Sequence, residues 1–237
     1  MRVYHYLPAK WAFRDLQHQR LKLAVLTDLN DPFDLLCYDL RNREMRQAFK
    51  ATRDELASRT GMLCFSRTWK NPVLWSHYVD KHRGICLGFD APDSLLVPVT
   101  YTAVRLPLDP DSPRLDLEFA TQWIKTKYDG WTCEEEVRVF ATRTDGPYMN
   151  FGPNLVLREV IAGPLCPYSA RLRAAMRTCS DDVELVRSRL AFRSFEVVRD
   201  QHGFVVAVAR PVEVVRRERR AVPRRVVVGI LLGVAAS

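Results

Sequence analysis

Two glutamates and an arginine stand at alternating positions in the segment that follows Trp131. They are Glu134, Glu136 and Arg138. On a strand beginning near Glu134, alternation would place all three side chains on one face. A glutamate and an arginine two residues apart usually form a surface or sheet-edge ion pair that contributes little. A glutamate at a strand start can also bond a ribose hydroxyl and stabilise an oxocarbenium-like transition state, which is the electrostatic task in breaking glycosidic bonds.

A second group of polar side chains lies near the end of a predicted helix. Trp75, Tyr78 and His82 lie at offsets that place them on one helical face, and His77 and Asp80 lie beside it. Imidazoles titrate near neutrality, so a cleft that holds two of them beside a carboxylate could transfer protons or bind an anion. The alternative is a hydrogen-bonded network with a purely structural role.

The basic character of the chain is concentrated near its carboxyl end. Of the formal net charge of +8, residues 216–225 carry six arginines and one glutamate. Arg216, Arg217, Arg219 and Arg220 could neutralise phosphates and bind nucleic acid in a salt-dependent way. No aromatic residue is interleaved with them to stack bases, and such runs are more often solvated tails. A nucleic-acid contact through this segment is therefore an alternative to a solvated tail.

The cysteines and the apolar runs indicate no metal site and no membrane partner. The six cysteines form no C-x-x-C pair and have no histidines at ligand spacing, so we expect reduced thiols packed as small hydrophobes. The longest apolar run, 226–236, is about half of what a membrane-crossing helix requires. The first six residues lack the apolar region of a signal peptide. We expect a cytoplasmic protein.

The elements that position these residues follow one another without a regular strand–helix alternation. Apolar patterning predicts strands over 2–6, 21–26, 62–66, 85–89, 97–101, 137–141 and 155–161. It predicts helices after Pro8, over 42–58, between Asn71 and Gly84, and over 117–128 and 169–176.

Turn residues complete the predicted organisation. Residues 30–34, Asn-Asp-Pro-Phe-Asp, are typical of a turn, and residues 200–203 would join a hairpin of strands over 192–198 and 204–209. No linker rich in glycine or serine divides the chain. We therefore expect one α+β domain over residues 1–215, with a mixed, mostly antiparallel sheet and peripheral helices, followed by a basic and apolar tail over 216–237.

Four separated segments carry a family resemblance. They are Val3-Tyr4-His5-Tyr6, the turn at 30–34, the block 63–90 with its W-S-H-Y-x-D-x-H-x-G pattern from Trp75 to Gly84, and the segment 131–138. Over roughly its first two thirds the chain resembles the bacterial domain-of-unknown-function 2971 family. That resemblance implies a fold and a set of candidate residues, but no reaction.

The order of an early histidine, a mid-chain tyrosine and a later glutamate is more remotely similar to the NAD-dependent ADP-ribosyltransferases. This resemblance implies that NAD is a substrate, that His5 holds the nicotinamide ribose and that Tyr78 packs against the nicotinamide. Glu136 would then orient the ribose, with Glu134 as an accessory acid. In that family the aromatic lies on or beside a strand, whereas the pattern here predicts that Tyr78 is helical. The catalytic candidates are therefore His5, Glu134 and Glu136, and the cofactor-binding candidates are Tyr4, His5, Trp75, His77, Tyr78 and Arg138.

These residues lead to competing functions. The first is an ADP-ribosyltransferase-like enzyme that uses a nucleotide-type molecule and modifies protein or nucleic acid, as toxins and phage-defence effectors do. The alternative is a non-catalytic nucleic-acid or protein-binding module in which Trp75, Tyr78 and Trp131 belong to the core. A third is a metal-independent hydrolase or nuclease that uses His77 and Asp80.

Overall fold

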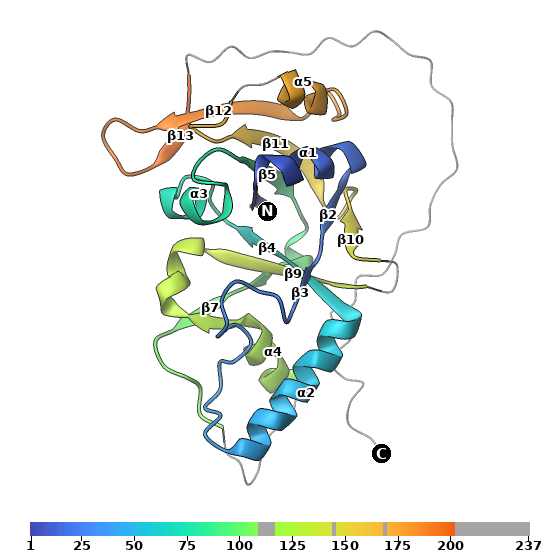
Figure 1. Ribbon diagram of the computed structural model, residues 1–237, viewed down its shortest axis with the longest axis vertical. Coiled ribbons are helices and arrows are strands. Elements are labelled where there is room, and N and C mark those ends of the chain that lie inside the picture. The colour runs from blue at the N-terminus through green and yellow to red at the C-terminus, as the bar shows by residue number, and fades with distance from the viewer. Residues whose placement is uncertain (109–116, 144–145, 168–169, 202–237) are drawn as a thin grey trace.

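A nine-stranded sheet forms the centre of the molecule (Figure 1). The computed structural model describes residues 1–108, 117–143, 146–167 and 170–201. The strand order is β13-β12-β11-β5-β1-β4-β9-β6, with β3 paired to β4 off this path. Their bounds are β1 Arg2–Leu7, β3 Ala24–Val25, β4 Thr60–Ser66, β5 Ile85–Asp90, β6 Val97–Pro98, β9 Glu136–Thr142, β11 Val156–Ala162, β12 Glu184–Leu190 and β13 Val197–Arg199.

Most strand pairs are antiparallel. In the large sheet only β11 and β12 run parallel among the described residues. Two small sheets flank it: β2 (Arg20–Lys22) pairs antiparallel with β10 (Tyr148–Asn150), and β7 (Thr100–Thr102) pairs parallel with β8 (Thr126–Tyr128). The α+β class with a mixed, mostly antiparallel sheet and peripheral helices is therefore confirmed.

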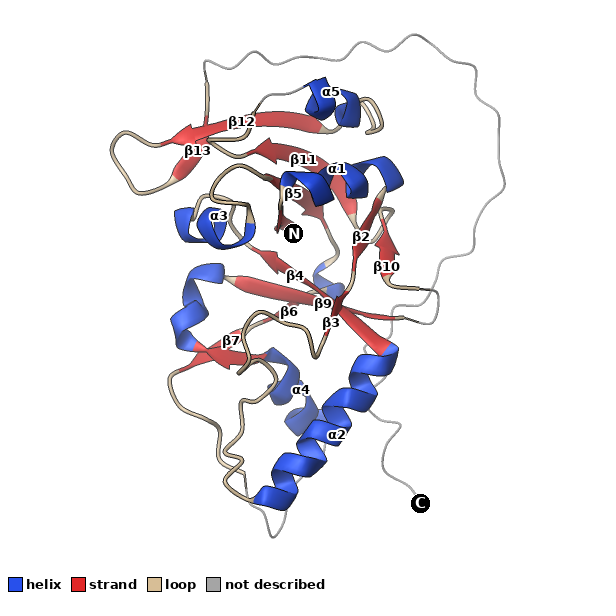
Figure 2. Cartoon of the chain, in the orientation of Figure 1, coloured by secondary structure: helices blue, strands red, loops and turns tan. Residues whose placement is uncertain are grey.

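The helices lie around the sheet in separate groups (Figure 2). Their bounds are α1 Ala9–His18, α2 Arg43–Arg59, α3 Pro72–Tyr78, α4 Leu117–Lys125 and α5 Ala170–Met176, with 3₁₀ turns η1 Asp93–Leu95 and η2 Asp129–Glu134. α1 contacts α5 and β5, whereas α2 contacts β4, the strand that follows it in sequence. α3 contacts both β1 and η2, and this contact brings two of the predicted site segments together.

Two asparagines begin helices that the sequence predicted. The side chain of Asn42 accepts hydrogen bonds from the backbone N–H groups of Glu44 and Met45 at 2.8 and 3.1 Å, which caps α2. Asn71 caps α3 in the same way through the N–H of Val73, and Pro72 occupies the first turn, where its missing N–H is tolerated. Tyr78, the last residue of α3, is helical as predicted.

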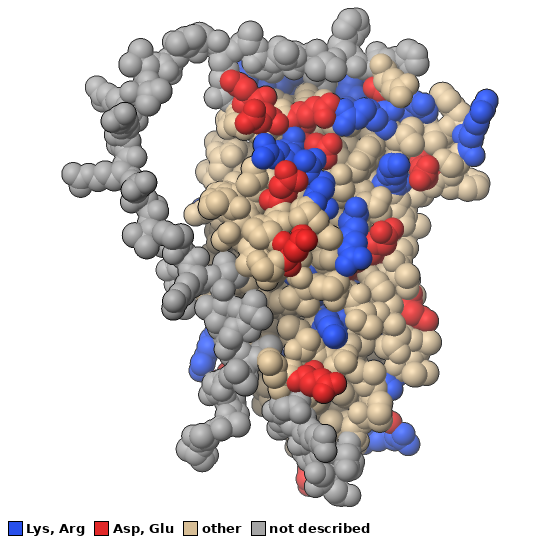
Figure 3. Space-filling model, turned by 180° about the vertical axis from the view of Figure 1, so that it is seen from behind, with Lys and Arg blue, Asp and Glu red and all other residues tan. Residues whose placement is uncertain are grey.

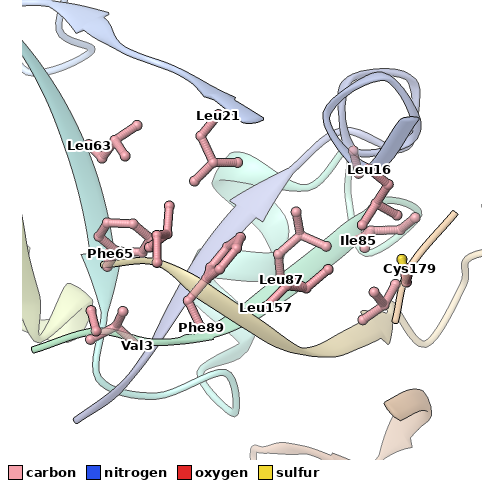
Figure 4. Packing of buried hydrophobic residues seen from close by; sticks show 14 of the residues in the cluster. Val3, Leu16, Leu21, Leu63, Phe65, Ile85, Leu87, Phe89, Leu157 and Cys179 are labelled. Atoms are coloured by element: carbon pink, nitrogen blue, oxygen red, sulfur yellow. The ribbon is translucent and has the colours of Figure 1, made fainter. Parts of the chain in front are cut away.

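Apolar clusters cover both sides of the sheet. On one side Val3, Phe65, Leu87 and Phe89 pack with Leu16 of α1 (Figure 4). A second cluster is formed by α2, α4 and neighbouring loops, and it includes Phe49, Met62 and Trp123. A third cluster surrounds α3, and it includes Trp75, Val79, Cys86 and Ile161. Strands β4 and β5 are buried along most of their length, as their continuous apolar runs predicted.

Three predicted elements are divided in the structure. The predicted strand 21–26 splits into β2 and β3, because β2 pairs with β10 whereas β3 pairs with β4. The predicted strand 97–101 splits between β6, which pairs with β9, and β7, which pairs with β8. The predicted helix 117–128 ends at Lys125, and the last three residues form β8 instead.

Of the strand predicted over 192–198 only Val197–Arg199 (β13) forms, and it makes a hairpin with β12, which the sequence did not predict. β12 pairs with β13, and the N–H of Ala191 bonds the carbonyl of Glu196 at 2.9 Å in the connection between them. β12 has the sequence ELVRSRL and buries only Val186 fully, so its apolar pattern is weak. The predicted strand over 204–209 lies outside the described residues. In the segments that the structure covers, no helix combines the length and apolarity that crossing a membrane requires.

Candidate functional site

The candidate site is a cavity of about 130 Å³ between β1, β4, α3 and the segment that leads into β9. We call it the carboxylate cavity. Its lining residues are Tyr4, His5, Tyr6, Leu29, Asn30, Asp34, Cys64, Phe65, Ser66, Leu74, Tyr78, Lys127, Glu134 and Glu136. The three catalytic candidates and Tyr78, which come from distant parts of the sequence, therefore line one cavity.

Lys127 lies at the centre of the polar groups in this cavity. Its Nζ donates to Oε2 of Glu134 at 2.5 Å and to Oε2 of Glu136 at 3.1 Å, and it lies 3.8 Å from Oδ2 of Asp34. Burial favours the neutral amine, but the carboxylates outweigh it and raise the pKa of Lys127. The ammonium group therefore stays charged, which makes it a counter-ion and not a nucleophile.

Arg138 fixes Glu136 and Asp34 from beneath the cavity. Its Nε donates to Oε1 of Glu136 at 2.8 Å, and its Nη2 donates to Oδ2 of Asp34 at 2.7 Å. Its Nη1 donates to the carbonyl of Ile124, and the side chain has no exposed surface. The Glu136–Arg138 pair is thus fully buried and unlike the surface pair that such spacing usually gives.

The two glutamates have opposite pKa shifts. Burial alone would raise the pKa of Glu136, but the charge and hydrogen bonds of Arg138, together with Lys127, lower it to about 2. For Glu134 burial outweighs Lys127 and raises the pKa, and burial likewise raises the pKa of Asp34. Glu136 therefore remains a carboxylate at neutral pH, while Glu134 is the more easily protonated of the two. Opposite shifts in one site are typical of paired acids with different roles.

Glu134 is held by a helix and a turn in addition to Lys127. The hydroxyl of Tyr78 donates to its Oε1 at 2.5 Å, and the side-chain amide of Asn30 donates to the Tyr78 hydroxyl at 2.8 Å. Burial, followed by the charge of Glu134, raises the pKa of Tyr78. Tyr78 therefore stays a phenol and acts as a donor to the carboxylate.

Glu134 does not belong to the strand that carries Glu136, which corrects the predicted alternation. It ends η2, and Glu135 between them has a left-handed backbone with φ of 44°. β9 begins at Glu136, which pairs with Ser66 of β4, and its N–H donates to the hydroxyl of Tyr101 at 2.8 Å. The left-handed residue turns the exposed Glu135 outward, and both neighbouring acids are buried.

His5 lines the cavity, although its side chain leaves β1 on the face opposite to that of Tyr4 and of Glu136, which is in register with Tyr4 across β4. Alternation along β1 places His5 with Val3 and opposite to Tyr4, and its ring lies 5.4 Å from that of Phe65. Its Nδ1 lies 2.8 Å from the carbonyl oxygen of Cys64, so the Nδ1–H group donates a hydrogen bond to this carbonyl. Burial lowers the pKa of His5 despite this carbonyl. The ring is therefore neutral, and its Nε2 is the hydrogen-bond acceptor.

Three cofactor-binding candidates do not line the cavity. Trp75 is fully buried, donates its indole N–H to the carbonyl of Trp69 and packs edge-on against Tyr6, so it is a core residue. His77 is exposed, and its ring lies 6.1 Å from that of Trp131. The guanidinium of Arg138 is wholly engaged in the contacts described above. Tyr4 does line the cavity, but its ring edge lies against Gly88.

The polar residues after α3 form a left-handed turn. Asp80, Lys81 and His82 have φ values of 47°, 53° and 68°. Asp80 is exposed and does not line the carboxylate cavity.

The arginines at 216, 217, 219 and 220 lie outside the described residues.

Three residues of the site were missed in the sequence. Asn30 and Asp34 stand at the two ends of the predicted turn. Within the turn, the side chain of Asp31 accepts a hydrogen bond from the N–H of Phe33, and the side chain of Asp34 accepts one from the N–H of Leu35. The turn thus directs Asn30 toward Tyr78 and Asp34 toward Arg138. Lys127 was assigned to a helix, and its single positive charge gave no signal of its own. The presence of two polar residues at the ends of a tight turn was the available clue.

The donor set of the cavity does not resemble a metal centre. Lys127 and Arg138 occupy the positions between the carboxylates where a cation would bind. Within the described residues no group of three or more His, Cys, Asp and Glu side chains could hold a metal ion, and the six cysteines are free thiols.

No protein-family model, curated protein or solved structure matches this chain. Both family resemblances therefore remain predictions, and the geometry of the carboxylate cavity is the basis for a functional proposal.

Proposed function

We propose that the carboxylate cavity binds the nicotinamide-ribose part of NAD and that the protein is an ADP-ribosyltransferase-like enzyme. The acceptor would be a protein or a nucleic acid, as expected of a toxin or a phage-defence effector. The observation that carries the proposal is that His5, Tyr78, Glu134 and Glu136 line one cavity, with the two glutamates shifted to opposite pKa values.

The charge of the cluster suits a glycosidic bond cleavage. In that reaction the bond between the nicotinamide nitrogen and C1′ of the ribose breaks, the nicotinamide leaves with the electron pair, and the ribose becomes an oxocarbenium-like cation. Asp34, Glu134 and Glu136 face the two cations Lys127 and Arg138, so the ionised cluster has one more carboxylate than cation. This excess negative charge would stabilise the developing cation.

The two acids would divide the remaining work. Glu136, which stays ionised, would accept a hydrogen bond from a ribose hydroxyl and stabilise the positive charge. Glu134, whose pKa is raised, would take the proton of the attacking acceptor. His5 would accept a second ribose hydrogen bond at Nε2, since its Nδ1–H group donates to the carbonyl of Cys64.

The size of the cavity limits what it can enclose. Its volume of about 130 Å³ is below the roughly 300–1,000 Å³ of pockets that enclose a whole drug-sized ligand. Only one ring of the nicotinamide-ribose part would be fully enclosed, and the adenosine half of NAD would lie outside the cavity.

The test is nicotinamide release from NAD by the full-length protein, with and without candidate protein and nucleic-acid acceptors. The variant Glu136→Gln should lose activity by about 100-fold or more, because it removes the charge that stabilises the transition state. Glu135→Gln is the matched control, since Glu135 is the exposed neighbour of both acids, and it should retain activity. Absence of nicotinamide release, together with no thermal shift on adding NAD, would refute the proposal.

A specific observation also favours the alternative of a non-catalytic binding module. Every charged group of the cluster has a partner within the protein, as expected of a purely structural network. Among the described residues, the face in Figure 3 shows Lys and Arg side chains interspersed with Asp and Glu, so a nucleic-acid contact would depend on residues 216–225. Salt-dependent retention on DNA or RNA that disappears when residues 216–225 are deleted would favour this alternative.

A further inference from the structure

A second and larger cavity lies beside α2 and shares no lining residue with the carboxylate cavity. Its volume is about 560 Å³, which is within the roughly 300–1,000 Å³ of small-molecule pockets. Five of its eight lining residues are cationic and one is acidic. They are Leu36, Asp39, Leu40, Arg41, Arg46, Lys50, Arg53 and Arg105, and we call the site the basic cavity.

The cations converge on this cavity from two sides. Arg46, Lys50 and Arg53 lie on α2 at offsets of four and three residues, so they share one helical face. Arg105 contributes from a separate segment, where its Nη1 donates to the carbonyls of Leu36 and Tyr38 at 2.9 and 3.2 Å. Like charges at this helical spacing repel one another, and of the three cavity-lining cations of α2 only Lys50 has a carboxylate partner within hydrogen-bond distance among the described residues, namely Asp54.

Several of the donors have no acceptor within the described part of the chain. The buried Nε of Arg53 makes no hydrogen bond there, and it lies 4.0 Å from Oδ1 of Asp54. Within the described residues Arg46 and Arg105 donate hydrogen bonds only through Nη1, which bonds backbone carbonyls and holds each guanidinium in place. Their Nε and Nη2 atoms are thus oriented donors, and the planar guanidinium group matches the oxygens of a phosphate.

Two of the cations are already compensated, which limits the expected charge of the ligand. Arg41 bonds Asp39 through Nε at 2.8 Å and Nη2 at 2.5 Å, and Lys50 bonds Asp54 at 2.8 Å. Arg46, Arg53 and Arg105 remain without a carboxylate within hydrogen-bond distance among the described residues. A ligand with two or more negative charges would balance them.

We propose that the basic cavity binds a small ligand that carries a polyphosphate group, such as a nucleoside di- or triphosphate. A concave site with apolar residues Leu36 and Leu40 in its wall favours a compact ligand. An extended nucleic-acid backbone would instead follow a long positively charged groove. The site is independent of the proposed NAD chemistry, because neither its residues nor its ligand depend on the carboxylate cavity.

The test is calorimetric titration of the full-length protein with inorganic tripolyphosphate and with ATP. The double variant Arg46→Ala/Arg53→Ala should weaken binding by about 100-fold, because each charge-assisted contact is worth about tenfold in affinity. Arg43→Ala/Arg59→Ala is the matched control, since it removes two arginines from the same helix that do not line the cavity, and it should weaken binding by less than about threefold.

A single variant on the opposite wall of the cavity distinguishes loss of a ligand contact from unfolding of α2. Arg105→Ala leaves α2 intact and should weaken tripolyphosphate binding by about tenfold. If ATP binds more tightly than tripolyphosphate, the ligand contains a nucleoside. If tripolyphosphate binds more tightly than ATP, the ligand is a free polyphosphate. Equal losses in the cavity and control variants, no binding at millimolar tripolyphosphate, or tighter binding of a DNA duplex than of either small ligand would overturn the proposal. None of these results alters the nicotinamide-release test.

Discussion

The hydroxyl of Tyr78 donates a 2.5 Å hydrogen bond to Oε1 of Glu134. Through this bond the end of α3 is joined to the end of η2, and the amide of Asn30 extends the connection to the turn at 30–34. Three segments that are distant in sequence therefore determine the environment of one carboxylate. The state of that carboxylate depends on all of them.

Replacing Tyr78 with phenylalanine should raise the pKa of Glu134 further. The hydrogen bond from the phenol favours the ionised carboxylate, so its loss favours the protonated form. In the proposed reaction Glu134 must be ionised to accept a proton, so the acid limb of the pH–rate profile of nicotinamide release should move to higher pH. Tyr128→Phe, at an exposed position, is the control. An unchanged acid limb in Tyr78→Phe would show that Glu134 does not accept the proton in the reaction.

Replacing Arg138 with methionine should destabilise the fold by about 3–5 kcal/mol, because Glu136 and Asp34 would be left buried without their main counter-ion. Arg158→Met is the matched control on a neighbouring part of the same sheet. Arg158 also pairs with an aspartate, Asp90 at 3.0 Å, but its side chain is 39% exposed, so its loss should cost at most about 1 kcal/mol. Urea unfolding of the two variants measures the difference, and similar losses would contradict the burial argument.

Replacing Asp15 with asparagine should stabilise the protein at neutral pH. Burial raises the pKa of Asp15 from 3.8 to about 6. Because the folded-state pKa is the higher one, the stability that protonation gives is complete below about pH 4 and is lost as the pH rises through about 6. Asp15→Asn removes the charge that must be buried, so it should gain about 1–2 kcal/mol at pH 7 and nothing near pH 3.5, allowing for partial screening. Thermal unfolding at both pH values checks this, with the exposed Asp28→Asn as control.

Replacing Gly163 with alanine should destabilise the protein by about 1–3 kcal/mol, through overpacking. A Cβ there would lie 2.4 Å from the carbonyl oxygen of His82 and 2.9 Å from the Trp75 ring. Gly152→Ala is the matched control, because its Cβ would meet nothing within 4 Å, and it should be neutral or slightly stabilising. Chemical denaturation distinguishes the two. Equal stability of both variants would show that the backbone near Gly163 can move apart.

Local chemistry made the elements near the site predictable. The apolar runs of β4 and β5 and the asparagine caps of α2 and α3 are signals contained within a few consecutive residues. The weakly patterned β12 and the short β8 were missed because their pairing partners lie elsewhere in the chain.

The site was predictable only in part, for a related reason. His5, Glu134 and Glu136 were selected by residue type, spacing and order along the chain, but whether Trp75 would face a ligand or the core depends on what packs against α3. The role of Lys127 depends on three carboxylates from two other segments, so no local pattern could indicate it.

The left-handed conformation of Glu135 places its two acidic neighbours in different structural elements. Glu136 is fixed by the ladder of β9 with β4, whereas Glu134 ends a short turn outside that ladder. A change in the length or sequence of residues 129–134 could therefore reposition one acid and leave the other undisturbed. In the proposed transferase, variation or directed selection in that stretch would offer a route to a different acceptor without rebuilding the rest of the molecule.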